Sequence, residues 1–265
     1  MMDKLIFGRY IPGDSIIHRL DPRSKLLSAM AFIIIIFFAN NWQTYLLLAA
    51  FVFLGLKLSG IKFSFFLNGV KPLIWLILFT VVLQVLFTSG NTILFSFGPI
   101  VVSEEGLVNG VFIALRFVLI IFMSTLLTLT TMPLSLTDAI EFILRPFKYV
   151  KVPVHEIALM LSIALRFVPT LMDETEKIMN AQRARGIEFG EGNLYEQMKA
   201  IVPMLIPLFV SSFNRADDLA TAMEARGYRG GEGRTKFRQL EWYRRDSFLL
   251  LVMLALAILL FLLRT

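Results

Sequence analysis

The stretch LVNGVFIALRFVLIIFMSTLLTL, residues 107–129, decides the class of fold. As a helix it is long enough to span the hydrocarbon core of a bilayer, and Arg116 is its one charged residue. The whole chain of 265 residues has the same character, because 57% of it is hydrophobic and 17% is charged, against about 25% in ordinary soluble domains. We therefore predict an all-α integral membrane protein.

Two apolar runs near the N-terminus predict a helical hairpin. Residues 26–39 and 42–58 are apolar, and Asn40-Asn41 separates them. Two adjacent asparagines are costly inside hydrocarbon, so they are expected at a turn between helices. One long bent helix is the alternative. The chain before residue 26 is polar and basic, and no cleavable signal peptide is expected there.

The third and fifth spans follow from similar runs. Residues 59–71 mix lysine with phenylalanine, which is typical of an interfacial segment, and Pro72 is expected to open a third span to about Phe87. The fourth span is residues 107–129, and the fifth is Phe248–Leu263. Between the third and fourth spans, Thr92–Phe95 and Ile100–Val102 fit a small β-hairpin.

The region between the fourth and fifth spans is different. Residues 133–247 hold sixteen of the 26 lysines and arginines. Their pattern predicts about three helices: a short one from about Ser135, a long one over Val154–Arg185 and another over Asn193–Arg226. Bends are expected in the two long helices at three prolines, Pro169, Pro203 and Pro207.

Charge sets the predicted orientation. Basic residues gather at residues 1–25, 57–71 and 133–247, and cytoplasmic loops carry such an excess. We therefore predict a multi-pass cell-membrane protein whose N-terminus and coupling helices are cytoplasmic and whose C-terminus is outside. The predicted domains are 1–132, with four spans; 133–243, a cytoplasmic coupling domain; and 244–265, the fifth span.

Two matching motifs end the two long helical patterns. Ala181-Gln-Arg-Ala184-Arg185-Gly186 ends the first, and Ala222-Met-Glu-Ala225-Arg226-Gly227 ends the second. An arginine complements the negative end of a helix, and a glycine after it allows the left-handed residue that stops a helix. Two ordinary helix ends are one interpretation. One docking device used twice, for two similar partners, is the interpretation we favour.

The chain resembles the transmembrane T component of energy-coupling factor transporters over nearly its whole length. The resemblance rests on Ala184-Arg185-Gly186, on Ala225-Arg226-Gly227, and on the openings Tyr10–Ser15 and His18–Leu26. It implies a non-catalytic subunit that joins two ABC-type ATPase subunits to one small substrate-binding membrane subunit, the S component. The complex would import a vitamin or other micronutrient. The two Ala-Arg-Gly ends would dock the ATPases, and those partners would bind ATP and Mg²⁺.

The residue inventory favours the same class over its rivals. The chain has no cysteine, and its two histidines, His18 and His155, are too isolated for a metal cluster. It has no GxxxxGK[ST] phosphate loop, so we expect no cofactor, no metal and no catalytic residue in this chain. Its net charge of +6 is attributed to membrane topology and not to nucleic acid.

Arg116 is the remaining candidate. A charge inside a membrane span is a functional candidate by default, but no acidic residue lies in any predicted span, so we interpret Arg116 as structural. Backbone carbonyls, Thr80 or Gln84 are its expected partners. A self-contained secondary transporter or permease, working without ATPases, is the alternative function. Such a protein would usually carry ionisable residues or broken helices near the bilayer midplane.

Overall fold

The computed structural model describes residues 10–88, 90, 92–97, 100–190, 192–230 and 240–264. The chain divides into two compact units, the first made of Met1–Ala139 with Gln239–Thr265, and the second of Ile140–Arg238. Some basic residues used for the predicted orientation lie outside the described residues, namely Lys4, Arg9 and the basic side chains of 234–238. The cytoplasmic placement of residues 133–243 stays a prediction.

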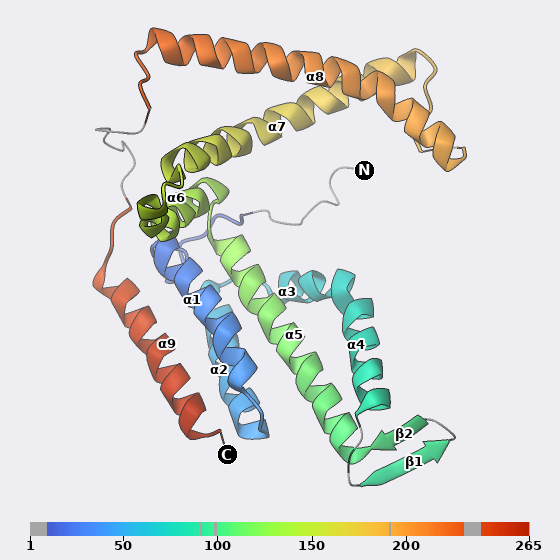
Figure 1. Cartoon of the computed structure of the whole chain (residues 1–265), viewed down its shortest axis with the longest axis vertical. Coiled ribbons are helices and arrows are strands. Elements are labelled where there is room, and N and C mark those ends of the chain that lie inside the picture. The colour runs from blue at the N-terminus through green and yellow to red at the C-terminus, as the bar shows by residue number, and fades with distance from the viewer. Residues whose placement is uncertain are drawn as a thin grey trace. The chain divides into compact units, whose positions relative to one another are not determined.

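The first two helices form the predicted hairpin (Figure 1). α1 (Pro22–Ile35) continues through a 3₁₀ turn, η2 (Ile36–Phe38), and α2 (Trp42–Ser59) runs back in the opposite direction. The two helices meet through side chains such as the stacked rings of Phe32 and Phe51, whose centres are 6.1 Å apart. Ala39 is extended, and Asn41 caps α2 by a reciprocal pair of bonds with Thr44. The asparagines therefore separate two helices, and the alternative of one long bent helix is wrong.

The third predicted span is bent near its start. α3 (Phe63–Val70) leads through a 3₁₀ turn, η3 (Lys71–Leu73), into α4 (Ile74–Phe87). Pro72 lies in that turn, two residues before α4 begins at Ile74, and not at the first residue of α4. The predicted hairpin is confirmed: β1 (Ile93–Phe97) pairs antiparallel with β2 (Ile100–Ser103).

α5 (Glu104–Thr130) is the central long helix of the first unit. It begins three residues before the predicted span because Ser103 caps it: the Ser103 Oγ accepts a hydrogen bond from the backbone N–H of Gly106 at 3.1 Å. Glu104 and Glu105 occupy its first turn, where negative charge is stabilised by the helix dipole.

The remaining helices follow the predicted pattern closely. α6 (Pro133–Leu144) gives way at Arg145 to the 3₁₀ segment η4 (Arg145–Val150). α7 (Val154–Ala184) and α8 (Leu194–Ala225) are the two long helices of the second unit, and each keeps its prolines inside the helix. α9 (Arg244–Leu262) returns to the first unit.

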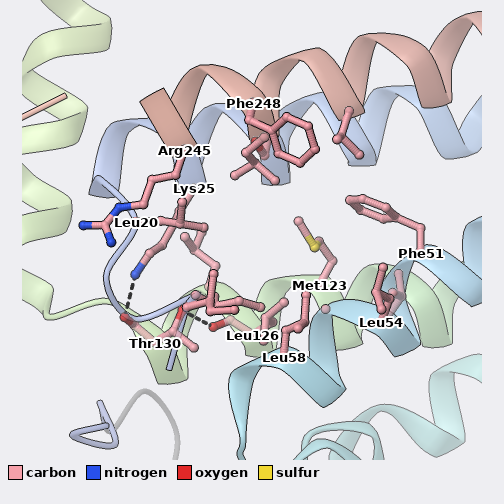
Figure 2. A pocket seen from close by; sticks show the side chains of 18 residues that line it. Leu20, Lys25, Phe51, Leu54, Leu58, Met123, Leu126, Thr130, Arg245 and Phe248 are labelled. Carbon is pink, nitrogen blue, oxygen red and sulfur yellow. Dashed lines mark hydrogen bonds between the residues drawn. The ribbon is translucent and has the colours of Figure 1, made fainter. Parts of the chain in front are cut away.

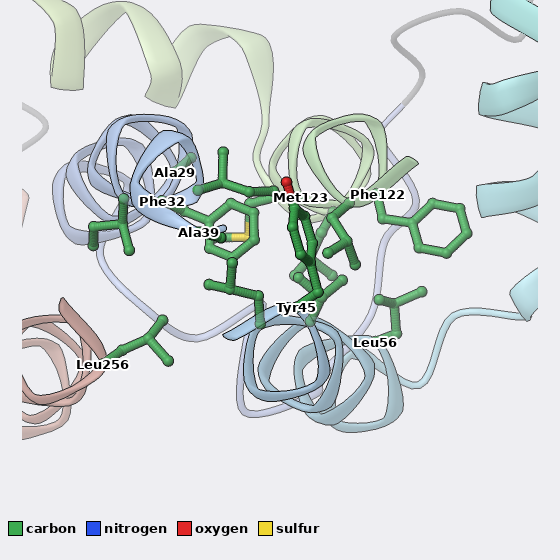
Figure 3. Close-up of a cluster of buried hydrophobic side chains, with 14 of the residues drawn as sticks. Ala29, Phe32, Ala39, Tyr45, Leu56, Phe122, Met123 and Leu256 are labelled. Atoms are coloured by element: carbon green, nitrogen blue, oxygen red, sulfur yellow. The ribbon is translucent and has the colours of Figure 1, made fainter. Parts of the chain in front are cut away.

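The core of the first unit lies where α1, α2 and α5 meet (Figure 3). Phe32, Tyr45 and Leu48 are fully buried there, and Phe122 and Met123 pack from α5. The outer surface is apolar as well: Trp75 on α4 is 80% exposed. An apolar exterior around an apolar core is what a bilayer requires, because the lipid tails solvate the outside.

A buried carboxylate joins the two ends of the first unit. The Asp246 side chain, near the start of α9, is fully buried. It accepts hydrogen bonds from the backbone N–H of Asp21 at 2.7 Å, from Ser24 Oγ at 2.9 Å and from the backbone N–H of Tyr243 at 2.8 Å. Three donors satisfy this carboxylate, so it fixes the start of α9 beside the start of α1.

Among the described residues, five helical segments are long and apolar enough to cross a membrane: Trp42–Ser59, Phe63–Phe87, Glu104–Thr130, Val154–Ala184 and Arg244–Leu262. The number agrees with the prediction, but the set differs in one member. The expected first span, residues 26–39, is too short by this measure, since α1 has 14 residues and η2 has three. α7 enters because charged residues are sparse in its first half, before Asp173.

Candidate docking site on helices α7 and α8

The end of α7 is a complete Schellman motif. The backbone N–H of Gly186 donates to the carbonyl of Arg183 at 2.9 Å, and the N–H of Ile187 donates to the carbonyl of Gln182 at 3.1 Å. Gly186 has a φ of 87°, in the left-handed region. Glycine adopts that conformation without strain, so the sequence Arg185-Gly186 stops the helix here.

The end of α8 repeats this geometry bond for bond. The N–H of Gly227 donates to the carbonyl of Glu224 at 2.8 Å, and the N–H of Tyr228 donates to the carbonyl of Met223 at 3.0 Å. Gly227 has a φ of 71°. The two motifs therefore share a backbone shape as well as a sequence, and a partner surface that fits one fits the other.

The two tips are open. All six motif residues are exposed: Ala184, Arg185, Gly186, Ala225, Arg226 and Gly227. A Cβ built on Gly186 or Gly227 would meet nothing within 4 Å, so packing within the chain does not explain either glycine. Within the described residues, no acidic side chain forms a salt bridge with Arg185 or Arg226. Each guanidinium can therefore meet an outside acceptor.

α7 and α8 are antiparallel and cross (Figure 1). Glu174 of α7 accepts hydrogen bonds from Ser211 and from Arg215, the latter at 2.8 Å. Gln182 Nε2 donates to the carbonyl of Pro203 at 3.0 Å. A helical carbonyl normally accepts from the residue four positions later, but that residue is Pro207, which has no N–H. Gln182 therefore satisfies a carbonyl that the α8 sequence leaves free.

The crossing separates the tips. Arg185 lies three residues past Gln182, at the crossing, whereas Arg226 lies 23 residues beyond Pro203 on the other helix. At about 1.5 Å per residue, that is roughly 35 Å along α8. Figure 1 shows the two helix ends on opposite sides of the crossing. The pair thus presents two similar tips to two separate places.

Apolar side chains are exposed along both helices. On α8, Phe209 and Phe213 are 61% and 72% exposed, and Met198 is 70% exposed. On α7, Met160 and Val168 are exposed too. Exposed apolar surface of this extent marks a contact with a protein or a membrane.

Arg116 occupies a separate place in the first unit. Its Nη2 donates to Tyr45 Oη at 2.9 Å and to the carbonyl of Ala39 at 3.4 Å, and its guanidinium lies 5.2 Å from the centre of the Phe37 ring. A backbone carbonyl was among the expected partners, but Tyr45 was not; Thr80 and Gln84 were expected from the neighbouring span, whereas Tyr45 comes from α2. The structural role of Arg116 stays a prediction.

Sequence reasoning also missed the contacts that set the crossing. Glu174, Gln182 and Arg215 appear in the sequence only as polar residues of two long helices. His155, read as an isolated histidine, has its Nδ1 3.6 Å from Glu141 Oε1. Pro207 alone was a signal for a free carbonyl at residue 203, because a proline inside a helix has no N–H to donate four residues back, but nothing in the sequence identified Gln182 as the replacement donor.

The fold is that of a multi-pass membrane protein with five candidate spans among the described residues, and its two long helices α7 and α8 end in matching exposed tips. Residues 13–237 match the family described as CbiQ, cobalt transport protein. The chain is 63% identical over 265 residues to the energy-coupling factor transporter transmembrane protein EcfT 1 of Listeria monocytogenes, covering 100% of both chains. It is 65% identical over 263 residues to EcfT of Lacticaseibacillus paracasei, covering 99% of this chain and 100% of that one. It is 55% identical over 264 residues to EcfT of Bacillus subtilis, covering 100% of both.

The chain therefore belongs to the family of transmembrane components of energy-coupling factor transporters.

Proposed function

We propose that the chain is the scaffold of an ATP-driven importer, and that it joins two ABC-type ATPase subunits to one small substrate-binding membrane subunit. One ATPase docks at Ala184-Arg185-Gly186 and the other at Ala225-Arg226-Gly227. The substrate-binding subunit carries a vitamin or other micronutrient. ATP and Mg²⁺ are bound by the ATPases, and this chain contributes no catalytic residue.

The observation that carries this proposal is the repeated tip geometry. Both tips have the same capping bonds, the same left-handed glycine and an exposed arginine. An arginine at a helix tip can donate to carboxylates or carbonyls in a groove, while the small alanine before it permits a close approach. Two matching tips some tens of ångströms apart suit two related partners and not one.

Energy coupling follows from the crossing. When ATP draws two ATPases together, each carries the helix tip docked in it. Hydrogen bonds of Glu174 and Gln182 hold α7 and α8 together, so movement of either tip changes the orientation of both helices. The exposed apolar faces of α7 and α8 supply the surface through which that movement reaches the substrate-binding subunit.

The proposed orientation places both tips in the cytoplasm. It takes α1 with η2 as the first span and keeps α7 out of the list of spans. If α7 crossed the bilayer in addition to α1, Arg185, Arg226 and most of the sixteen basic residues of 133–247 would lie outside, against the positive-inside tendency. If α7 replaced α1 as a span while the N-terminus stayed inside, the basic residues of 57–71 and 145–151 would lie outside, against the same tendency. α1 with η2 spans about 25 Å, enough for a first span in a slightly thinned bilayer.

The alternative is a secondary transporter that works without ATPases. It would need ion-binding groups near the midplane. In the described spans of the first unit, Arg116 is the charge nearest the middle of a span, and Tyr45 and the Ala39 carbonyl already engage it. The scaffold is therefore the better explanation.

The test is a set of charge reversals at the tips. A charge-assisted hydrogen bond contributes about 1.5–3 kcal/mol, so losing one should weaken a site roughly ten- to a hundred-fold. Arg185→Glu or Arg226→Glu alone should leave some assembled complex, because the other tip keeps the ATPase pair close. The double variant should release the ATPases and abolish ATP-driven uptake in vesicles.

Arg183→Glu is the matched control. It makes the same charge change in the same last turn, but two residues earlier and therefore on another side of α7. It should keep ATPase binding near the level of the unmodified protein in a pull-down. Full ATPase binding and uptake by the double variant would show that the two arginines are ordinary helix ends.

A further inference from the structure

The first unit contains a cavity of about 260 Å³ that the proposed function does not use (Figure 2). It lies between α1 and α9 on one side and α2 and α5 on the other. Apolar side chains form its walls, among them Leu58, Leu126 and Phe248. Such a space excludes a polar solute and accepts a hydrocarbon chain.

One end of the cavity is cationic. The Lys25 side chain is almost fully buried, and its Nζ donates to the carbonyl of Thr130 at 2.9 Å and to that of His18 at 3.2 Å. An ammonium has three donors, and these carbonyls take two of them. Arg245 also lines the cavity, and no acidic side chain of the described residues forms a salt bridge with it.

A buried hydroxyl points to an occupant. Ser28 lines the cavity one turn after Lys25 and is 1% exposed. Its Oγ has no hydrogen-bond partner among the described residues. A buried polar atom without a partner costs free energy unless something fills the site and bonds to it.

The cavity opens toward the surface that faces lipid. Leu54 and Phe248, both in its lining, are 57% and 68% exposed. Most of the lining comes from the first turns of α1 and α9 and the last turns of α2 and α5, which is the end of each helix that the proposed orientation places in the cytoplasm. Ile16, Ile17 and Leu20, in the segment before α1, complete it. The cytoplasmic leaflet is rich in anionic lipid.

We propose that this cavity binds an anionic phospholipid of the cytoplasmic leaflet. One acyl chain enters the apolar part, and the phosphate accepts hydrogen bonds from Lys25 and Arg245. The leaflet assignment rests on the orientation proposed above. The site itself rests on the cavity, its two cations and the unpaired Ser28 hydroxyl, and its test needs no ATPase activity.

The experiment is native mass spectrometry of the full-length protein in its complex, after delipidation and re-addition of mixed vesicles of phosphatidylglycerol and phosphatidylcholine. The unmodified protein should retain phosphatidylglycerol in preference to phosphatidylcholine. Losing one charge-assisted hydrogen bond to the phosphate should weaken binding about tenfold or more. Arg245→Gln should therefore lower the phosphatidylglycerol preference about tenfold or more, whereas Arg244→Gln, at the neighbouring exposed arginine outside the lining, should lower it about fivefold at most, the general effect of one basic group near a membrane surface.

A second pair of variants tests whether the apolar part of the cavity holds an acyl chain. Leu54→Trp fills the cavity and should remove the retained lipid, while Leu46→Trp, at an exposed position of the same helix away from the cavity, should keep it. Inorganic phosphate should not displace the lipid, because phosphate alone has no acyl chain to bury in the cavity. Equal lipid preference in the two arginine variants, or equal retention in the two tryptophan variants, would overturn the proposal whether or not the ATPases bind.

Discussion

Arg116 on α5 donates a hydrogen bond to Tyr45 on α2, in the middle of the apolar first unit. We expect Arg116→Leu to lower protein abundance at most and to leave transport per assembled complex largely intact, because it removes a half-buried charge that is costly inside a membrane span. Since Arg116 donates to Tyr45, the effects of Arg116→Leu and Tyr45→Phe on stability should not add, with an interaction energy of about 0.5–3 kcal/mol. Normal abundance with abolished uptake in Arg116→Leu would contradict a structural role.

Gly186 separates the two explanations of the helix tips. Alanine there would meet no atom of the chain, so Gly186→Ala should cost only the strain of a left-handed residue, about 1–2 kcal/mol. Asn tolerates that conformation better, so Gly186→Asn should preserve the helix end. If a partner's groove closes on the glycine, ATPase binding in a pull-down should fall for both variants. Binding kept by Gly186→Asn but lost by Gly186→Ala would assign the glycine to backbone shape alone.

Among the helix contacts, the effects of Pro207 and Gln182 on stability should be coupled. Gln182→Met removes the donor to the Pro203 carbonyl and should destabilise the crossing by about 1–3 kcal/mol, which lowers the thermal midpoint by several degrees. Pro207→Ala restores an intrahelical N–H to that carbonyl. The cost of Gln182→Met should therefore shrink in the Pro207→Ala background, as followed by thermal unfolding of the purified protein. An equal cost in both backgrounds would show that Gln182 acts by packing.

Helix positions were largely readable from local sequence, whereas their mutual contacts were not. Asn40-Asn41 marked the α1–α2 turn and Arg185-Gly186 marked the end of α7, because capping depends on neighbouring residues. The bond from Gln182 to Pro203 joins separate helices, and no local pattern specifies which polar side chain meets which. The predicted and observed sets of spans differed for a related reason. Length and hydropathy judge each helix by itself, so they select the long helix α7 and pass over α1, which is short and packs against other helices.

For the whole molecule, the orientation can be tested on a chain that contains no cysteine. A cysteine replacing Ser96, in β1, should react with an impermeant thiol reagent added to intact cells. One replacing Asn193, the N-cap of α8, should react only after permeabilisation, because the basic residues hold that region inside. Labelling of position 193 in intact cells would refute both the orientation and the docking of ATPases at the tips.

The buried Asp246 carboxylate has a consequence for how the protein is made. Its partners Asp21 and Ser24 are synthesised among the first residues, yet their acceptor arrives more than two hundred residues later. Until α9 leaves the ribosome and inserts, the backbone N–H of Asp21 lacks this acceptor, although the Ser24 hydroxyl can still donate to the Asp21 carbonyl at 2.8 Å. The start of α1 is therefore made early but completes its contacts only after α9 has inserted. During that interval, the cell's quality-control proteases can recognise chains that stop before their final helix.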